Sequence, residues 1–349
     1  MTAVSRLDLA RLGGNDRVMA HAVVATSYGG PEVLDVIEVD PGHPGAGEVL
    51  LDVRACGVNA SDWKRYSGAW GTDPDDLPIR LGQECAGVVL EVGPDVEGVQ
   101  VGDEVIAYRV SGAYTDRLVA KATALTPKPS ILTWEKAAGL MVTGATAVHA
   151  LSATKVGAGD TVLVHGASGG VGSMIVQLAR AKGARVIGTA DPSNHEYLVD
   201  LGAVPVGYGP GLVDRLRKAA HGEVTAAIDV SGTREALDAS VALIRDRRRV
   251  ATIAGFSYGA ALGIKLLGNG PGADPGVEIR DAARTQLTRL VEQGHLDVRV
   301  GATYPLHEAA RAHRAGIEMR VQGKLILIPG EVPAGAAQSR SRRLLRRPR

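Results

Sequence analysis

Between positions 19 and 134 the chain alternates short apolar runs with turns that are rich in glycine and proline. Runs of this kind, separated by turn signals such as Gly93-Pro94 and Gly102-Asp103, predict β-strands with tight connections. The expected strands are Ala20–Ala25, Glu48–Val58, Cys85–Gly93, Asp103–Tyr108 and Asp116–Ala120. This part of the chain is therefore predicted to form a strand-rich domain.

The pattern changes at Thr133, a candidate N-cap for a helix that we expect to continue to about Ala153. Apolar strands then alternate with amphipathic helices. The expected strands are Thr161–Gly166, Ala184–Ala190, Ala203–Tyr208, Thr225–Gly232 and Arg248–Phe256. The expected helices are Val171–Ala181, Asn194–Leu201, Leu212–His221 and Arg234–Ile244. This alternation predicts an α/β fold, in which a doubly wound parallel sheet of the Rossmann type is covered by helices on both faces.

The last part of the chain predicts helices near Asp281–Glu292 and Leu306–Ala315, followed by the strand "GKLILIP". A single strand needs a sheet to join, so we expect it to return to the strand-rich domain. The predicted division is 19–134 with 297–330 for the strand-rich domain, and 135–296 for the Rossmann domain. We expect 1–18 to be a flexible leader and 331–349 a disordered, arginine-rich tail.

Composition narrows the class of protein. Of the 349 residues, 45% are apolar and 22% are charged, and the net charge of +1 favours neither nucleic acid nor an anionic membrane as a partner. Positions 340–349 hold six arginines, which we interpret as a solvated end, with nucleic-acid or membrane binding as the minor alternative. The least polar window, 250–267, is interrupted by glycine and polar residues and predicts buried strands and a loop instead of a membrane span.

Cysteine usage and the N-terminus bear on the compartment. Two cysteines, Cys56 and Cys85, are too few for a disulfide framework or a four-cysteine zinc site. They are typical of a protein of the reducing cytoplasm. The first 18 residues contain no uninterrupted apolar core, so no secretory signal is expected.

The strongest motif is the turn "GASGGVG" at 166–172, between an apolar strand and an amphipathic helix. Gly169 and Gly170 would let the backbone approach a pyrophosphate, and Gly172 would let helix and strand pack closely. Backbone N–H groups and the helix dipole would hold the anion. Ala167 stands where the first glycine of the usual G-x-G-x-x-G pattern is expected, with Gly166 adjacent. The context nevertheless predicts a dinucleotide-binding site.

Asp191 follows the next strand, at a distance along the chain typical of an acid that bonds the ribose 2′-hydroxyl of NAD. It lies one residue beyond the expected strand end and directly before Pro192. A turn or N-cap aspartate is therefore an equally good interpretation.

At this point the chain resembles the zinc-independent, quinone oxidoreductase-like branch of the medium-chain dehydrogenase/reductases, from about position 19 to position 329. The motifs that carry the resemblance include "YGGPEVL", "PGAGEVLLDVRACGVNASDWKRYSG", "LGQECAGVVLEVG", "VGDEVIA", "MVTGATA", "GASGGVG" and "GKLILIP". The resemblance implies a GroES-like catalytic domain that clasps a Rossmann domain, with the active site in the cleft, and a homodimer or tetramer. It also implies NADPH-dependent reduction of quinones, or of activated C=C bonds in enals and enones, with NADH as the alternative cofactor.

The resemblance also bears on zinc. Zinc-dependent relatives keep a cysteine ligand in the loop matching "CGVNASD", at the position of Asn59, and a histidine ligand at the position of Gln83. Amide side chains are poor zinc ligands beside thiolate or imidazole. The four-cysteine lobe of those relatives has no counterpart after Val105. No catalytic or structural zinc is therefore expected.

The family's cofactor contacts can be transferred to matching positions here. Thr143 would lie against the nicotinamide, and Ser168, Gly169, Gly170 and Val171 would face the pyrophosphate. Tyr208 would lie near the adenosine phosphate, Ser231, Ala254, Gly255 and Phe256 would line the cofactor, and Lys324 would lie near its groove. Ser193 stands where an arginine is frequent in NADPH-using relatives, with His195 nearby and Asp191 placed to repel a 2′-phosphate. NADPH is still the expectation that the resemblance implies.

Without a metal, catalysis would depend on positioning and on a donor to the developing oxyanion. Asn59 is the first candidate for that donor, with a purely structural role in its own loop as the alternative. Lys64 and Tyr66 follow in the same segment and could reach the substrate or supply a proton. The alternative for them is a surface position, and solvent could supply the proton instead.

The stretch "RLGQECAG" at 80–87 places an acid beside a thiol. We interpret Gln83 as the mark of an absent metal, Glu84 as the partner of a cation or of backbone groups, and Cys85 as a small apolar strand residue. His149 and His165 do not have metal-ligand spacing and are expected in the core or at the edge of the cleft.

Three functions remain open from the sequence. The first is an NAD(P)H-dependent reductase of quinones or enones. The second is an enoyl reductase that acts on carrier-bound acyl chains. The third is a non-catalytic NADPH-sensing or RNA-binding protein, which only the arginine-rich tail favours.

Overall fold

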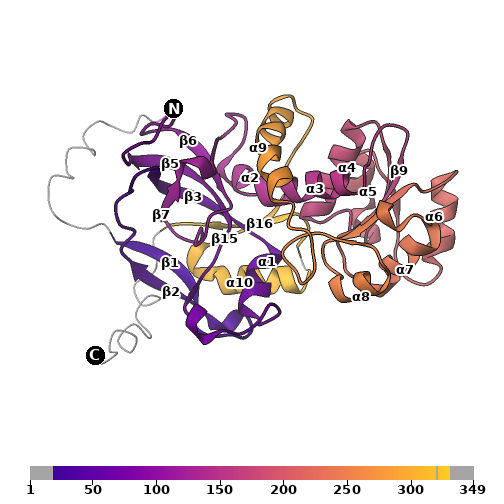
Figure 1. The fold of residues 1–349 in the computed structure, drawn as a ribbon, viewed down its shortest axis with the longest axis horizontal. Coiled ribbons are helices and arrows are strands. Elements are labelled where there is room, and N and C mark those ends of the chain that lie inside the picture. Colours follow the sequence, from indigo (N-terminus) through magenta and orange to yellow (C-terminus); the bar gives the residue numbers. More distant parts are fainter. Residues whose placement is uncertain (1–18, 320, 331–349) are drawn as a thin grey trace.

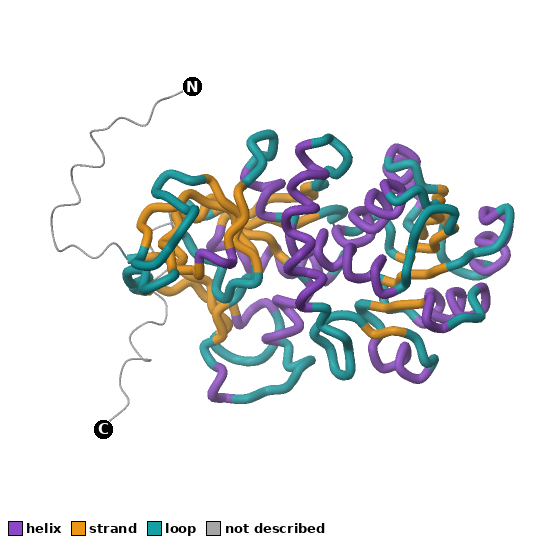
Figure 2. The backbone as a smooth tube through the Cα atoms, turned by 45° about the horizontal axis from the view of Figure 1, so that its top comes forward, coloured by secondary structure: helices purple, strands orange, loops and turns teal. Residues whose placement is uncertain are grey.

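The computed structural model describes residues 19–319 and 321–330. The predicted leader and tail lie outside the described residues. The molecule is elongated, with a strand-rich half that holds the early strands and a half in which helices flank a second sheet (Figures 1 and 2). None of the helices described is long and apolar enough to cross a membrane.

The strand-rich half contains two sheets. The smaller has the order β2-β1-β4, formed by Leu34–Val39, Ala20–Ala25 and Ile79–Arg80. The larger has the order β15-β16-β3-β5-β6-β8, with β7 also paired to β3. Its strands are β3 (Glu48–Val58), β5 (Glu84–Val92), β6 (Glu104–Tyr108), β7 (Arg117–Lys121), β8 (Leu125–Pro127), β15 (Val300–Pro305) and β16 (Lys324–Ile328).

The last strand, β16, lies between β15 and β3, where Leu327 pairs with Cys56 and Leu325 pairs with Val58. Figure 1 shows this late segment among strands from the start of the chain. The expectation that the final strand joins the strand-rich sheet is therefore confirmed.

The second half is built on a six-stranded parallel sheet of order β11-β10-β9-β12-β13-β14. Its strands are β9 (Thr161–His165), β10 (Arg185–Thr189), β11 (Val204–Val206), β12 (Ala226–Asp229), β13 (Val250–Thr252) and β14 (Lys265–Leu266). The chain reverses direction across the sheet between β9 and β12. This is the Rossmann order, and ligands bind outside the carboxyl ends of the strands at such a switch point.

Side chains alternate across this sheet as a sheet covered on both faces requires. In β9, Val162 and Val164 belong to the apolar core that includes Met174 of α4, whereas Leu163 belongs to a separate core that includes Leu216 of α6. The flanking helices are α3 (Met141–Ala153), α4 (Gly170–Ala181), α5 (His195–Asp200), α6 (Leu212–Ala220), α7 (Arg234–Leu243) and α9 (Val277–Glu292). The predicted parallel sheet with helices on both faces is confirmed.

Three local predictions need correction. The helix expected from Thr133 onward is two helices, α2 (Trp134–Ala138) and α3, because the chain turns at Gly139, where a Cβ would lie 3.1 Å from the Lys324 side chain. Residues 256–261 form a helix, α8 (Phe256–Ala261), where a loop was expected. A short helix, α1 (Ala60–Tyr66), also interrupts the strand-rich region, and α10 (Ala309–Ile317) packs against that half.

Candidate active site

The phosphate loop follows β9 and is tied to the end of β10. Ala167 N donates to Thr189 O over 3.0 Å. Gly166 has a left-handed backbone (φ +74°), which glycine adopts at little cost. The buried Ala167 side chain faces Gly188, where a Cβ would lie only 2.7 Å away. Ala167 therefore fills a packing position in the loop, at the place where the usual pattern has glycine.

The loop opens α4 with free backbone donors. Gly169 is the N-cap, and no side chain of the described residues caps the helix. A Cβ on Gly172 would lie 2.2 Å from Gly166 O, so only glycine fits there, whereas a Cβ on Gly169 would meet its nearest atom at 3.5 Å. The phosphate loop and the first turn of α4 thus form a cradle that is tightly packed at Gly172 and open at Gly169. These features fit a dinucleotide pyrophosphate.

Most of the other predicted cofactor residues lie along the carboxyl edge of the parallel sheet. Ser231 follows β12, and Ala254, Gly255 and Phe256 follow β13. The loops are held by Asp229, whose carboxylate accepts from Ser231 N (3.0 Å) and from Thr252 Oγ1 (2.7 Å). Tyr208 follows β11 and is 60% exposed. The fold therefore brings these residues to one edge.

Thr143 and Ser168 lie where the two halves of the molecule meet the phosphate loop. Thr143 Oγ1 donates to Gly139 O over 2.8 Å, and its methyl group lies 3.3 Å from where a Cβ of Gly170 would be. Ser168 Oγ donates to Gln322 Oε1 over 3.1 Å. Gln322, just before β16, was missed by the sequence analysis, because no local pattern links it to a loop so distant in the chain.

Asn59, Glu84 and Lys324 form one buried polar cluster. Lys324 Nζ donates to Asn59 Oδ1 (2.7 Å), Glu84 Oε1 (2.9 Å) and Val58 O (2.9 Å). Asn59 Nδ2 donates to Glu84 Oε1 (3.1 Å) and Gly57 O (3.2 Å). Both amide hydrogens of Asn59 are therefore engaged, which supports its structural alternative. The ammonium group of Lys324 points into this cluster, and its aliphatic stem passes Gly170.

Glu84 links this cluster to the second half of the molecule. Its Oε2 accepts from Val142 N, at the start of α3, over 2.8 Å. The predicted cationic and backbone partners of Glu84 are thus Lys324 and Val142. The neighbouring Cys85 lies opposite Cys56 in the β3–β5 register, and burial raises the pKa of both thiols, to about 12 for Cys56. Both cysteines are neutral strand residues at physiological pH.

Two candidates on α1 have different surroundings. Tyr66 is 1% exposed, and its hydroxyl lies 2.8 Å from His313 Nδ1, so it faces the core. Lys64 Nζ lies 5.8 Å from the centre of the Phe256 ring, across from α8. Burial lowers the pKa of Lys64. Lys64 is therefore the member of the pair that faces the other half.

A second buried network of hydrogen-bonded side chains, which the sequence did not predict, supports α1. Asp62 accepts from Tyr114 OH (2.8 Å), Asn59 N (2.9 Å) and Gln83 Nε2 (3.3 Å). Burial raises the pKa of Asp62 to about 6 and lowers that of His313 to about 3. His313 is therefore neutral, and because Tyr114 donates to Asp62, the imidazole donates to Tyr114 through Nε2 (3.1 Å) and accepts at Nδ1 from Tyr66.

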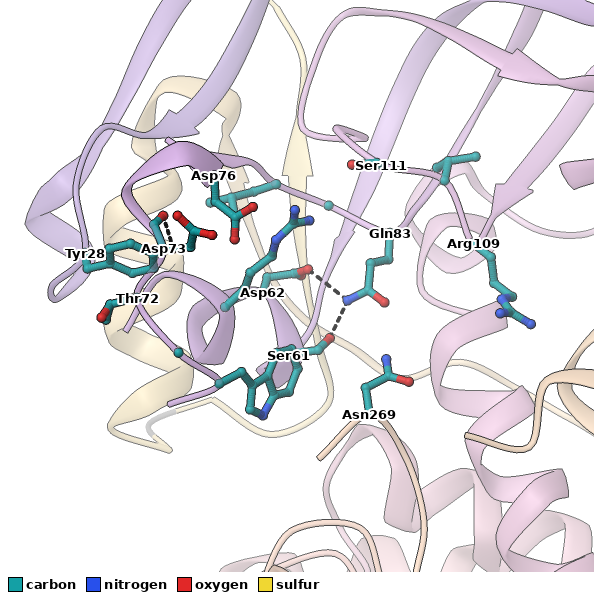
Figure 3. A pocket seen from close by; sticks show the side chains of 16 residues that line it. Tyr28, Ser61, Asp62, Thr72, Asp73, Asp76, Gln83, Arg109, Ser111 and Asn269 are labelled. Carbon is teal, nitrogen blue, oxygen red and sulfur yellow. Dashed lines mark hydrogen bonds between the residues drawn. The ribbon is translucent and has the colours of Figure 1, made fainter. Parts of the chain in front are cut away.

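A cavity of about 550 Å³ opens beside Gln83. Its wall includes Gln83, Arg109 and residues of α1 from the strand-rich half. Asn269, in the loop after β14, comes from the other half (Figure 3). The Gln83 amide donates to Ser61 Oγ over 2.6 Å, and the Ser61 hydroxyl hydrogen has no acceptor among the residues described. Polar groups from both halves therefore converge on this cavity.

Histidines and acids do not gather into a metal-binding group in the part of the chain that the structure describes. His149 and His165 are both buried, as expected. His165 Nδ1 lies 3.2 Å from Thr189 Oγ1, and burial lowers its pKa to about 4. The side-chain amides of Gln83 and Asn59 both donate to protein groups, as described above.

Comparisons with known proteins agree with this geometry. Residues 45–150 match the family model of the alcohol dehydrogenase GroES-like domain, and residues 170–268 match that of the zinc-binding dehydrogenases. The quinone oxidoreductase of Salmonella typhimurium is 31% identical over 329 residues, which cover 89% of this chain and 100% of that protein. The structure of the Escherichia coli quinone oxidoreductase complexed with NADPH superposes with a TM-score of 0.77 at 29% identity, covering 88% of this chain and 100% of that one.

A Rossmann sheet with a dinucleotide cradle, joined to a GroES-like domain, defines an oxidoreductase of the alcohol dehydrogenase fold. Identity at this level over nine-tenths of the chain shows the family as well. This protein belongs to the medium-chain dehydrogenase/reductases, among their quinone oxidoreductase-like members.

Proposed function

We propose that this enzyme transfers a hydride from a reduced nicotinamide dinucleotide to a quinone or to the activated C=C bond of an enal or enone. The observation that carries the proposal is the open cradle in front of Gly169, together with a polar cavity to which both halves contribute. The names of the relatives support a quinone, and the structure of one of them with NADPH supports a dinucleotide. When bound, the nicotinamide supplies the hydride.

In this proposal the residues of the chain position the reactants. The first-turn N–H groups of α4 hold the pyrophosphate, and the methyl group of Thr143 lies against the nicotinamide. Glu84 fixes the start of α3, and hence Thr143, by its bond to Val142 N. A misplacement of the reacting atoms by even one ångström is costly in rate, so this anchoring contributes to catalysis by orientation.

Donors to the developing oxyanion would come from the cavity wall. Asn59 is engaged on both amide hydrogens, so we assign it a positioning role in the cluster with Glu84 and Lys324. Ser61 has a hydroxyl hydrogen to donate, and Asn269 lies across the cavity. Lys64, which faces Phe256 at the junction of the two halves and whose pKa is lowered by burial, is the candidate proton donor to a reduced enone.

We also propose that the reaction needs no zinc. Gln83 and Asn59 offer amides, which bind Zn²⁺ poorly, and each amide already donates to protein acceptors. Metal analysis of the purified enzyme, and its activity after dialysis against a chelator, would test this. A stoichiometric zinc ion whose removal abolishes turnover would contradict the proposal.

The experiment for the proposed function is a turnover assay on the full chain. NADH and NADPH are each mixed with 1,4-benzoquinone, an enal or an enone, and the absorbance of the reduced nicotinamide is followed. Oxidation that depends on both enzyme and acceptor is expected. If a dinucleotide binds, as its fluorescence would show, but no acceptor oxidises it, the proposal is wrong and a non-catalytic dinucleotide-binding role is favoured.

Two further expectations belong to the proposal. The family resemblance implies a homodimer, and this remains part of the proposal. Light scattering after size-exclusion chromatography would test it. A cytoplasmic location agrees with the two buried free thiols, and cell fractionation would test it.

A further inference from the structure

The end of β10 carries an acid at the rim of the dinucleotide cradle. Thr189 O accepts from Ala167 N (3.0 Å) and Thr189 Oγ1 from Gly166 N (3.3 Å), so the end of the strand is fixed to the phosphate loop. Asp191 stands two residues further on. In a Rossmann fold the adenosine ribose lies beside the end of this second strand.

The Asp191 carboxylate is held in one orientation. Its Oδ1 accepts from Ser193 N (2.9 Å) and Ser193 Oγ (2.6 Å), which makes Asp191 the N-cap of the turn at Pro192–Asn194. Among the described residues, its Oδ2 has one long contact, at 3.5 Å with Tyr208 OH, and both side chains are exposed. The bonds from Ser193 also hold the pKa of Asp191 below its usual value. Asp191 can therefore cap the turn through Oδ1 and bind a ribose hydroxyl through Oδ2, so the two interpretations are compatible.

No arginine or lysine side chain among the described residues bonds Asp191, whose hydrogen-bond partners there are Ser193 and Tyr208. Arg180, Arg185 and Arg215, on the flanking elements, each donate to backbone carbonyl groups. His195 is the basic side chain nearest along the chain, and its Nε2 lies 3.4 Å from Ala190 O.

A second acid lies on the same rim. Glu235 Oε2 accepts from Gly209 N over 3.0 Å, in the loop that carries Tyr208. Glu235, in the first turn of α7, therefore adds a second negative charge beside the loop whose Tyr208 contacts Asp191.

We propose that Asp191 makes this enzyme bind NADH in preference to NADPH. Its Oδ2 accepts a hydrogen bond from the ribose 2′-hydroxyl of NADH and repels the 2′-phosphate of NADPH. This inference rests on the proposed function and departs from the NADPH expectation that the family resemblance implies. Repulsion between a carboxylate and a dianionic phosphate about 5 Å apart in water amounts to about tenfold or more in affinity.

The test measures binding, apart from turnover. NADH and NADPH are titrated into the full chain by nicotinamide fluorescence, and 5′-AMP and 2′,5′-ADP compete as fragments without a nicotinamide. The wild-type protein is expected to bind NADH about tenfold tighter than NADPH, and 5′-AMP tighter than 2′,5′-ADP. Asp191→Asn should reduce both ratios by about tenfold, chiefly by tightening the phosphorylated ligand.

The control is Asp200→Asn, which removes the same charge from an exposed position at the far end of α5 and should leave both ratios unchanged. Equal or tighter binding of NADPH by the wild-type protein would overturn the inference and leave the proposed function intact. So would ratios that Asp191→Asn does not alter. If neither dinucleotide binds, the proposed function fails, and this inference fails with it.

Discussion

Lys324 Nζ lies 2.9 Å from Glu84 Oε1, and both side chains are almost completely buried, at 4% and 0% exposure. The two residues come from β16 and β5, on either side of β3, and Asn59 at the end of β3 bonds both. Because Glu84 also holds Val142 N, the pair connects the strand-rich sheet to the helix that carries Thr143.

Breaking this pair on one side is expected to destabilise the protein strongly. Glu84→Gln leaves the Lys324 ammonium buried without a counter-charge, and such changes cost about 3–5 kcal/mol in the free energy of unfolding. Denaturant titration measures the loss. The double variant Glu84→Gln with Lys324→Met should recover part of it, because the buried charge is removed. Equal stability of the single variant and the wild-type protein would contradict this account.

Asp62 is expected to make stability depend on pH. Its pKa rises from 3.8 to about 6 on folding, so between these values the native state binds more protons than the unfolded chain. The free energy of unfolding should therefore fall as pH rises from about 4 to about 6, by up to about 3 kcal/mol. Urea titrations across this range measure the slope.

The control for Asp62 is Asp62→Asn, which does not titrate. The asparagine oxygen can accept from Tyr114 and Asn59, and Gln83 can turn its amide to accept from the new Nδ2. This variant should fold and should lack the part of the pH dependence that Asp62 contributes. An unchanged slope would show that other groups cause it.

The phosphate loop offers a matched pair of glycine substitutions. Gly172→Ala places a Cβ 2.2 Å from a backbone oxygen, so the loop must shift and both stability and dinucleotide binding should be lost. Gly169→Ala meets its nearest atom at 3.5 Å, so the fold should be retained. Its Cβ enters the open front of the cradle, and dinucleotide affinity should fall by about tenfold or more. Thermal melts and fluorescence titration separate the two effects.

Lys64 is expected to act as the general acid that protonates the enolate formed in enone reduction. Lys64→Met should lower kcat by about a hundredfold, since general acid catalysis typically contributes that much. Lys64→Arg keeps the charge over Phe256 but cannot release a proton at ordinary pH, so it should be equally impaired. Full activity in Lys64→Arg would assign the residue a positioning role instead.

The pH dependence of the rate tests independently whether Lys64 donates the proton. The wild-type rate with an enone should fall on the alkaline side as Lys64 loses its proton, and the lowered pKa brings this fall to a lower pH than for an exposed lysine. Lys64→Met should lack this limb. Lys218→Met, on the exposed face of α6, is the control and should keep it.

The features that could be predicted from the sequence are those that depend on local patterns of residues. The Rossmann sheet, the glycine cradle and the N-cap at Thr133 follow from periodicity and turn chemistry within short windows, and the structure has each of them. The helix α8 was missed because "FSYGAA" is short and its glycine and aromatic residues do not favour a helix on their own.

The side-chain networks could not be predicted, because they join residues far apart in the chain. His313 reaches Tyr66 and Tyr114 only after α10 has folded back against the strand-rich half, and Gln322 meets Ser168 in the same way. Asn59 was a good candidate donor as a loop residue in sequence. In the structure, Glu84 and Lys324 bond the side-chain amide of Asn59, which favours the structural alternative over the donor role.

The placement of β16 within its sheet also has a consequence for biosynthesis. The ribosome synthesises β3 and β5 long before Lys324–Ile328, so Glu84 has no Lys324 to pair with until synthesis reaches β16. The Rossmann sheet uses β9 to β14, which are contiguous in the chain, and it can form while synthesis continues. Nascent chains stalled before Lys324 should therefore present an ordered dinucleotide cradle beside a strand-rich half whose central sheet is still incomplete.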